Sequence, residues 1–275
     1  MKYYQLYAIK ILITCLINTH TNFVQAQNNT VVNSNYEQAE KLRKTMQYDS
    51  AIIYYQKAIT DLEASGKIEP CVNAYNQIGI ILTRQDKYDA AKYTLLKALE
   101  IGGLKLDSNN LEIANTYISL GVVLNAEKKY TEALAYHEKA LQIRLLKVGE
   151  MHSLTATSYG NIGNVYLNAK AYYKSIEAHT KAMQIRSIVF GDKSAEITES
   201  YRGLGNAYRE QKDYENALLY FKKGLENKIL QRGEIHSDVT KFYTQISEVH
   251  LLMQDEANAK AYKLKANNIQ QQIKQ

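Results

Sequence analysis

Small and apolar residues return along this chain at a fixed long interval of 42 residues. The clearest marker is a glycine at positions 79, 121, 163 and 205. A tyrosine precedes each glycine by four positions, and the residue directly before each glycine is a leucine or an isoleucine. Alanine follows twelve positions later in most copies, where one copy has Ser175 instead. Such regular self-similarity indicates tandem copies of one supersecondary unit.

Each copy is expected to be a pair of helices. The chain has one proline, no tryptophan and long stretches of helix-forming residues, which favours an all-α protein. Glycine on the first helix and alanine on the second lack bulk, so the two backbones can approach closely and large neighbours can interlock. The 23 tyrosines of the chain fit this packing, because a tyrosine buries its ring while its hydroxyl stays in water.

The links between copies have a pattern of their own. They read Gly149-Glu150-Met151-His152, Gly191-Asp192-Lys193-Ser194 and Gly233-Glu234-Ile235-His236. Glycine suits the left-handed residue that ends a helix, and the serines at 153, 194 and 237 suit the N-cap of the next one. Where a shorter repeat would have a proline, these copies have Leu145, Ser187 and Ile229, so we expect the second helix to run about two turns further.

Together, the 42-residue units, the Gly-Glu-x-His link and the Tyr-x-x-(Leu/Ile)-Gly motif resemble the tetratricopeptide repeats of kinesin light chains and of bacterial proteins with similarly long units. The resemblance covers about residues 35–270. It implies an α–α superhelix, a solenoid of about six helical hairpins that recognises peptide segments and has no catalytic residues. The expected units are approximately 35–68, 70–108, 112–152, 154–194, 196–236 and 238–272.

The N-terminus has the character of a secretory leader. Residues 1–26 combine basic Lys2 and Lys10, a short apolar run and Val24-Gln25-Ala26 before the expected mature start at Gln27. We therefore expect a signal peptide over 1–26, a linker over 27–34 and an exported protein, periplasmic or extracellular. Lipid attachment at Cys15 is disfavoured because the preceding residue, Thr14, does not fit a lipobox. A cytoplasmic protein remains the alternative if the leader is not cleaved, and the N-terminal sequence of the mature chain would decide.

Composition excludes several kinds of chemistry. The formal charge of +6 becomes +4 without Lys2 and Lys10, and basic residues alternate with acidic ones, so no nucleic-acid partner is expected. Cys71 would be the single thiol of a mature chain, which removes disulfide and cysteine–metal motifs. His137 and His179 share one position in successive repeats and are expected at the core edge, whereas His152 and His236 are expected to cap or pack at turns. We expect no enzyme, no cofactor and no metal.

Function is therefore expected to lie in the groove lined by the first helix of each unit, where asparagine predominates. Asparagine forms helices poorly, so it is an unusual choice for a helix that is merely solvated. We hypothesise that these amides bind the main chain of an extended peptide, while Arg202 and Arg209 attract an acidic side chain or a C-terminus. The candidate peptide-binding residues are Asn76, Arg84, Asn125, Asn161, Asn164, Asn168, Arg202, Asn206 and Arg209.

The preferred interpretation is a scaffold or adaptor whose partner is a protein or peptide of unknown identity, with no membrane span in the mature chain. Self-association stays open. Two alternatives also stay open: a sensory input module of a bacterial signalling system, and a cytoplasmic scaffold. A groove of asparagines with no dedicated ligand would explain the same residues equally well.

Overall fold

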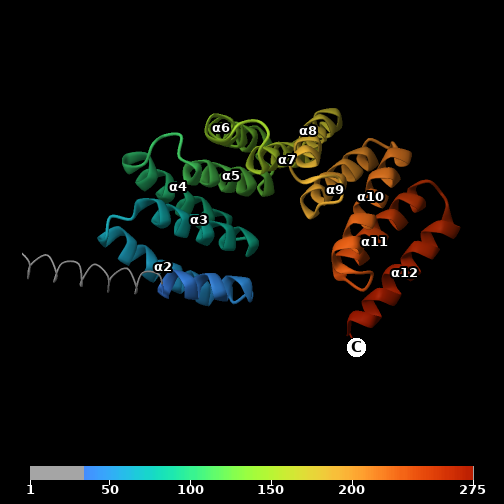
Figure 1. Cartoon of the computed structure of the whole chain (residues 1–275), viewed down its shortest axis with the longest axis horizontal. Coiled ribbons are helices and arrows are strands. Elements are labelled where there is room, and N and C mark those ends of the chain that lie inside the picture. Colours follow the sequence, from blue (N-terminus) through green and yellow to red (C-terminus); the bar gives the residue numbers. More distant parts are fainter. Residues whose placement is uncertain (1–33, 275) are drawn as a thin grey trace, which may run out of the picture. The chain divides into compact units, whose positions relative to one another are not determined.

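The computed structural model describes residues 34–274, and these residues form helices joined by short turns (Figure 1). No strand occurs within this range. The first helix covers residues 34–44. It is followed by α2 (Tyr48–Ala64), α3 (Ile68–Arg84), α4 (Tyr88–Lys105), α5 (Leu111–Ala126), α6 (Tyr130–Val148), α7 (Ser153–Asn168), α8 (Tyr172–Phe190), α9 (Ala195–Glu210), α10 (Tyr214–Arg232), α11 (Ser237–Leu252) and α12 (Glu256–Lys274).

These helices make six hairpins, so the expected all-α tetratricopeptide-type fold is confirmed. Within residues 34–274, no helix has both the length and the apolar character needed to cross a membrane. The proposed signal peptide and Cys15 lie outside the described residues, as does all of the proposed linker except Ser34, which is already helical.

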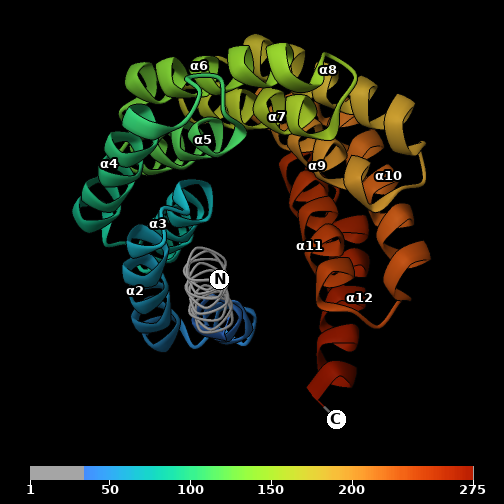
Figure 2. The same cartoon turned by 60° about the vertical axis from the view of Figure 1, so that its left-hand side comes forward.

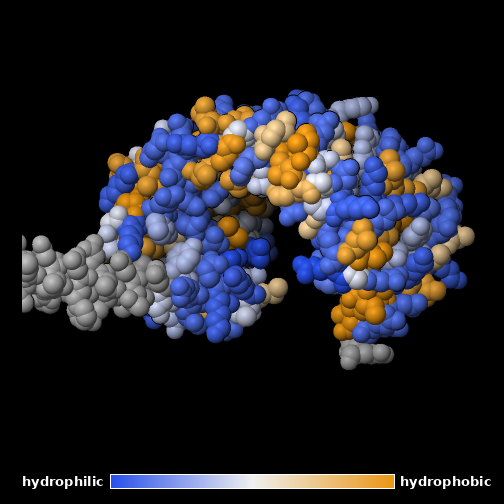
Figure 3. Space-filling model, in the orientation of Figure 1, coloured by the Kyte–Doolittle hydropathy of each residue, from blue (hydrophilic) through white to orange (hydrophobic). Residues whose placement is uncertain are grey.

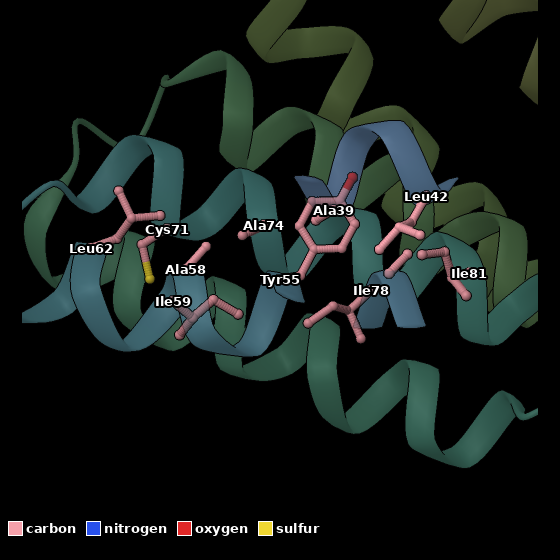
Figure 4. Packing of buried hydrophobic residues seen from close by; sticks show 11 residues of the cluster. Ala39, Leu42, Tyr55, Ala58, Ile59, Leu62, Cys71, Ala74, Ile78 and Ile81 are labelled. Atoms are coloured by element: carbon pink, nitrogen blue, oxygen red, sulfur yellow. The ribbon is translucent and has the colours of Figure 1, made fainter. Parts of the chain in front are cut away.

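The described chain divides into two compact units, one ending at Ser108 and the other beginning at Asn109. The first unit contains the helix over 34–44 and α2 to α4. Its core gathers around Tyr55, whose ring is fully buried and lies among Ala39, Ala58 and Ile78 (Figure 4). Cys71 belongs to the same apolar cluster, and burial raises the pKa of its thiol to about 12. This cysteine therefore acts as a small packing residue.

The second unit contains the four hairpins from α5 to α12. Each helix contacts the next along the chain, and α7 also contacts α5 and α9. The first helices α5, α7, α9 and α11 consequently lie on one side of this unit, and α6, α8 and α10 lie on the other (Figure 2). This stacking places the first-helix side chains of successive repeats next to one another.

The repeated glycines allow the close packing predicted for them. A Cβ atom added at Gly121 would lie 2.6 Å from the ring of His137, and one added at Gly205 would lie 2.6 Å from the ring of Phe221. Gly79 and Gly163 have the same relation to Leu95 and to His179. In each hairpin the large residue lies sixteen positions after its glycine, so one contact repeats through four hairpins.

The links between repeats differ from the prediction in one respect. Gly149, Gly191 and Gly233 have φ values of +83°, +85° and +76°, so glycine takes the left-handed position as expected. The N-caps of α7 and α11, however, are His152 and His236, and the predicted serines at 153 and 237 are already the first helical residues. Each histidine accepts a backbone N–H through Nδ1, at 3.1 Å, because its extended backbone turns the ring over the first turn.

Helices α6, α8 and α10 each have 19 residues, against 16 for α5, α7, α9 and α11. The second helices therefore continue past Leu145, Ser187 and Ile229, as the missing prolines predicted.

Candidate functional site

A polar cavity of about 340 Å³ lies among α7, α8 and α9, on the first-helix side of the second unit. Apart from the imidazole of His179, its wall contains no aliphatic or aromatic side chain. The lining residues are Thr157, Gly160, Asn161, Asn164, His179, Arg186, Glu199, Arg202, Gly203 and Asn206.

Two glycines shape this cavity. Gly160 stands where the preceding repeat has Ile118, and a Cβ atom at Gly160 would come no closer than 3.8 Å to the Arg186 guanidinium. There is consequently free space above that guanidinium. Gly203 lets His179 pack closely, because a Cβ at this position would lie 2.5 Å from the imidazole.

Arg186 reaches the cavity from the second helix, α8. Its Nη1 donates a hydrogen bond to Ser200 Oγ at 2.6 Å, and this hydroxyl is the hydrogen-bond partner that the described residues give it. Burial lowers the pKa of Arg186, while Glu199 and Glu196 act in the opposite direction. An arginine guanidinium stays charged in proteins, and this one keeps N–H groups that point to no acceptor among residues 34–274.

His179 forms part of the floor and is only 3% exposed. Neither of its ring nitrogens has a hydrogen-bond partner within residues 34–274. Burial, together with Arg186 and Arg202, lowers its pKa to about 4, so the ring is neutral at physiological pH. A neutral imidazole offers one donor and one acceptor. His137, in the preceding repeat, is also buried, and burial lowers its pKa to about 4. Both histidines are core residues, buried more deeply than the core edge where they were predicted.

A second polar cavity, of about 710 Å³, lies between α9 and α11. It shares Arg202 and Asn206 with the first, so the two cavities are neighbours along one face. The remaining residues of its wall are Arg209, Ser237, Thr240, Lys241, Thr244, Gln245, Glu248 and Gln270. The name polar trough is used below for these two cavities together. Elsewhere on the second unit, apolar patches interrupt the hydrophilic surface (Figure 3).

Five of the nine predicted binding residues line the polar trough: Asn161, Asn164, Arg202, Asn206 and Arg209. Three of these five side chains already have a hydrogen-bond or ion-pair partner in the chain. Asn206 accepts a hydrogen bond from Gln245 at 3.3 Å, and Arg209 forms ion pairs with Glu210 at 3.1 Å and with Glu248 at 3.0 Å. Arg202 pairs with Glu199 in the same way. These arginines are therefore less available to an acidic ligand than the sequence alone suggested.

The other four predicted residues lie elsewhere. Asn168 donates to Asn125 at 3.1 Å, so this pair joins α7 to α5 outside the trough lining. Asn76 and Arg84 belong to α3 in the first unit. Asn76 is only 2% exposed, because its position faces the packed interior, and it cannot form part of an open binding surface. Arg84 is exposed and donates to the Tyr48 hydroxyl at 3.2 Å.

Sequence reasoning missed Arg186, Gly160 and Gly203, because it considered only polar residues of the first helices. One signal was present. The position of Arg186 carries a cation in three successive repeats, since Arg144 and Lys228 are its equivalents in the repeats before and after. Gly160 also replaces the apolar residue, Ile118, of the preceding repeat.

The sequence profile of the tetratricopeptide repeat family matches residues 70–145, 112–170 and 154–229, which is more than half of the chain. The chain belongs to the tetratricopeptide repeat family. Comparison with curated proteins found no match.

Solved structures agree on the fold of this tetratricopeptide repeat protein. BtubC (BKLC) from P. vanneervenii is 16% identical with a TM-score of 0.65, covering 90% of this chain and 92% of its own. Kinesin light chain TPR-like repeats from Podosopora anserina are 12% identical with a TM-score of 0.63, covering 74% and 96%. Pseudomonas aeruginosa pilF is 15% identical with a TM-score of 0.61, covering 88% and 93%. At these identities the likeness concerns the fold alone.

Proposed function

We propose that this protein is a binding scaffold that holds an extended segment of a partner protein along the polar trough. The carrying observation is that two polar cavities adjoin on the first-helix face and share Arg202 and Asn206. A linear series of cavities suits an extended chain better than a compact ligand. Family membership supports protein binding in general, since these repeats present a rigid face on which specificity depends on a few side chains.

Side-chain amides give such a trough its main-chain specificity. Asn164 is exposed and Asn206 is half-buried, and they occupy the same position of α7 and α9. Each amide group can donate to a peptide carbonyl and accept from a peptide N–H. Two amides at equivalent places of adjacent repeats could thus bind two peptide groups of one extended segment.

The placement of the histidines supports binding without catalysis. His137 and His179 are buried with lowered pKa values, and His152 and His236 cap helices. Each of the four rings is therefore either packed in the core or engaged in capping a helix, which is the placement of structural residues.

The test combines cross-linking with substitution. A photo-reactive residue at position 206 should capture the natural partner, whereas the same residue at exposed Asn267 on α12 should not. Against the captured partner's contacting segment, N164A/N206A should lower affinity at least about tenfold, because each lost hydrogen bond is worth about 1 kcal/mol. The melting temperature should stay nearly constant. N267A/N268A is the matched control, and unchanged affinity of N164A/N206A would refute the proposal.

A further inference from the structure

The guanidinium of Arg186 is partly buried, and some of its N–H groups face an open cavity without a protein acceptor. Arginine has five N–H groups, and the described residues supply one acceptor, Ser200 Oγ. None of the Arg186 nitrogens is among the buried atoms that lack a partner. The remaining N–H groups are therefore accessible from the cavity, where solvent or a ligand can reach them.

The preceding and following repeats show what a cation at this position normally meets. Arg144 donates to Leu154 O at 2.8 Å, to Ser158 Oγ at 2.9 Å and to Asn115 Oδ1 at 2.9 Å. In the following repeat Lys228 lies 3.8 Å from the carboxylate of Asp238.

Arg186 lacks such a set of partners for identifiable reasons. Thr157 stands where Asn115 would supply an amide oxygen, and Gly160 stands where Ile118 would fill the space. Arg144 and Lys228 thus have partners within the protein, whereas Arg186, in the repeat between them, faces a cavity.

The charge and size of the cavity indicate which ligand would fit it. Its charged lining residues are Arg186, Arg202 and Glu199, which sum to a formal charge of +1. That excess matches one carboxylate better than a phosphate dianion. A volume of about 340 Å³ accepts one side chain and a few waters, and the amides of Asn161, Asn164 and Asn206 stand around it.

We propose that this cavity binds a single carboxylate group of the partner segment, with Arg186 as its anchoring residue. The planar guanidinium can donate two parallel hydrogen bonds to a carboxylate, a geometry that a neutral amide cannot match in strength. The inference rests on the proposed function for the origin of the carboxylate, which is either an Asp or Glu side chain or a chain terminus.

The site can be tested with small probes and the full chain. Arg Nε–Hε signals are followed by NMR during titration with N-acetyl-glutamate N-methylamide, its glutamine analogue, N-acetyl-alanine and inorganic phosphate. The first and third probes separate a side-chain carboxylate from a terminal one. We expect saturable shifts at Arg186 with either or both carboxylates, in the millimolar range. The glutamine analogue should bind about tenfold more weakly, because charge-assisted hydrogen bonds are about twice as strong as neutral ones.

The internal control is the Arg144 signal, which should not move, because its guanidinium is held by three protein acceptors. Three variants locate the site. R186Q removes the anchor, G160I restores the filling side chain of the preceding repeat, and T157N restores a competing amide oxygen. R186Q and G160I should abolish the saturable binding, and T157N should weaken it severalfold. Thermal melts of each variant establish that it is folded.

Three results would overturn the assignment: equal binding of the glutamine analogue, tighter binding of phosphate than of either carboxylate, or unchanged binding in folded G160I. Failure here is separable from failure of the proposed function. If the partner segment still depends on Asn164 and Asn206 while R186Q leaves its affinity unchanged, the scaffold role stands and the carboxylate site does not.

Discussion

The joints between α6 and α7 and between α8 and α9 occupy the same place in successive repeats, yet the chain holds them differently. At the first joint, Arg144 from α6 binds Leu154 O in the first turn of α7, and His152 caps that helix. Thr155 Oγ1 adds a hydrogen bond to Gly149 O at 2.7 Å. The first joint is thus closed by side chains on both sides of the turn.

At the second joint, fewer side chains contact the first turn of α9. Ser194 is the N-cap of α9, but its side chain caps no backbone N–H and its buried Oγ has no partner in the described structure. Asn227 supports the link from the next helix pair, donating to Asp192 O at 2.9 Å. Among the described residues, the guanidinium of Arg186 donates a hydrogen bond to Ser200 alone. A constant backbone therefore supports a rigid joint in one repeat and an open cavity in the next, according to a few side chains.

The largest expected contrast is between R144A and R186A. R144A leaves a void in a site that is 3% exposed and deprives three acceptors of their donor, so it should cost about 3 kcal/mol of unfolding free energy. R186A removes one hydrogen bond beside an existing cavity and should cost about 1 kcal/mol. Urea unfolding of both variants measures the difference. The control is R232A on the surface, for which little change is expected, and equal costs of R144A and R186A would mean that the two joints do not differ energetically.

Acid should weaken the α5–α6 and α7–α8 hairpins through His137 and His179, whose rings pack against Gly121 and Gly163. Burial lowers the pKa of His137 and of His179 to about 4, from the ordinary 6.5. Between these two values the unfolded chain binds protons that the folded chain does not, so stability falls as the pH drops from about 6.5 toward 4. At pH 5 each histidine should lower the free energy of unfolding by about 2 kcal/mol relative to its value at neutral pH.

H137F/H179F tests this acid sensitivity, because Phe221 fills the equivalent position over Gly205 in the next hairpin. Urea midpoints at pH 7.5 and pH 5 are compared for the variant and the parent. The variant should lose less stability on acidification. A parallel loss in both proteins would show that other groups account for the acid effect.

The sequence predicted the hairpins well because each depends on local, repeated contacts. The glycine at 121 and the residue sixteen positions later, His137, specify one close contact, and the same spacing specifies it again at Gly205 and Phe221. Part of the trough was also predicted, since Asn161 and Asn164 share a helix face. Arg186 was not, because its availability depends on what is missing: an amide at Thr157 and a side chain at Gly160.

The smallest expected effect concerns the caps of the two joints, and it asks whether the closed joint owes part of its stability to His152. H152A removes the acceptor of the Leu154 N–H and should cost about 1 kcal/mol, as loss of a helix cap usually does. S194A removes a hydroxyl that caps nothing and should change stability by less than about 0.5 kcal/mol. Hydrogen exchange at the first turns of α7 and α9 reports each effect locally. Faster exchange in α7 of H152A, with α9 of S194A unchanged, is the expected result; equal acceleration in both would mean that Ser194 caps α9 in solution and that the two joints are alike at this position.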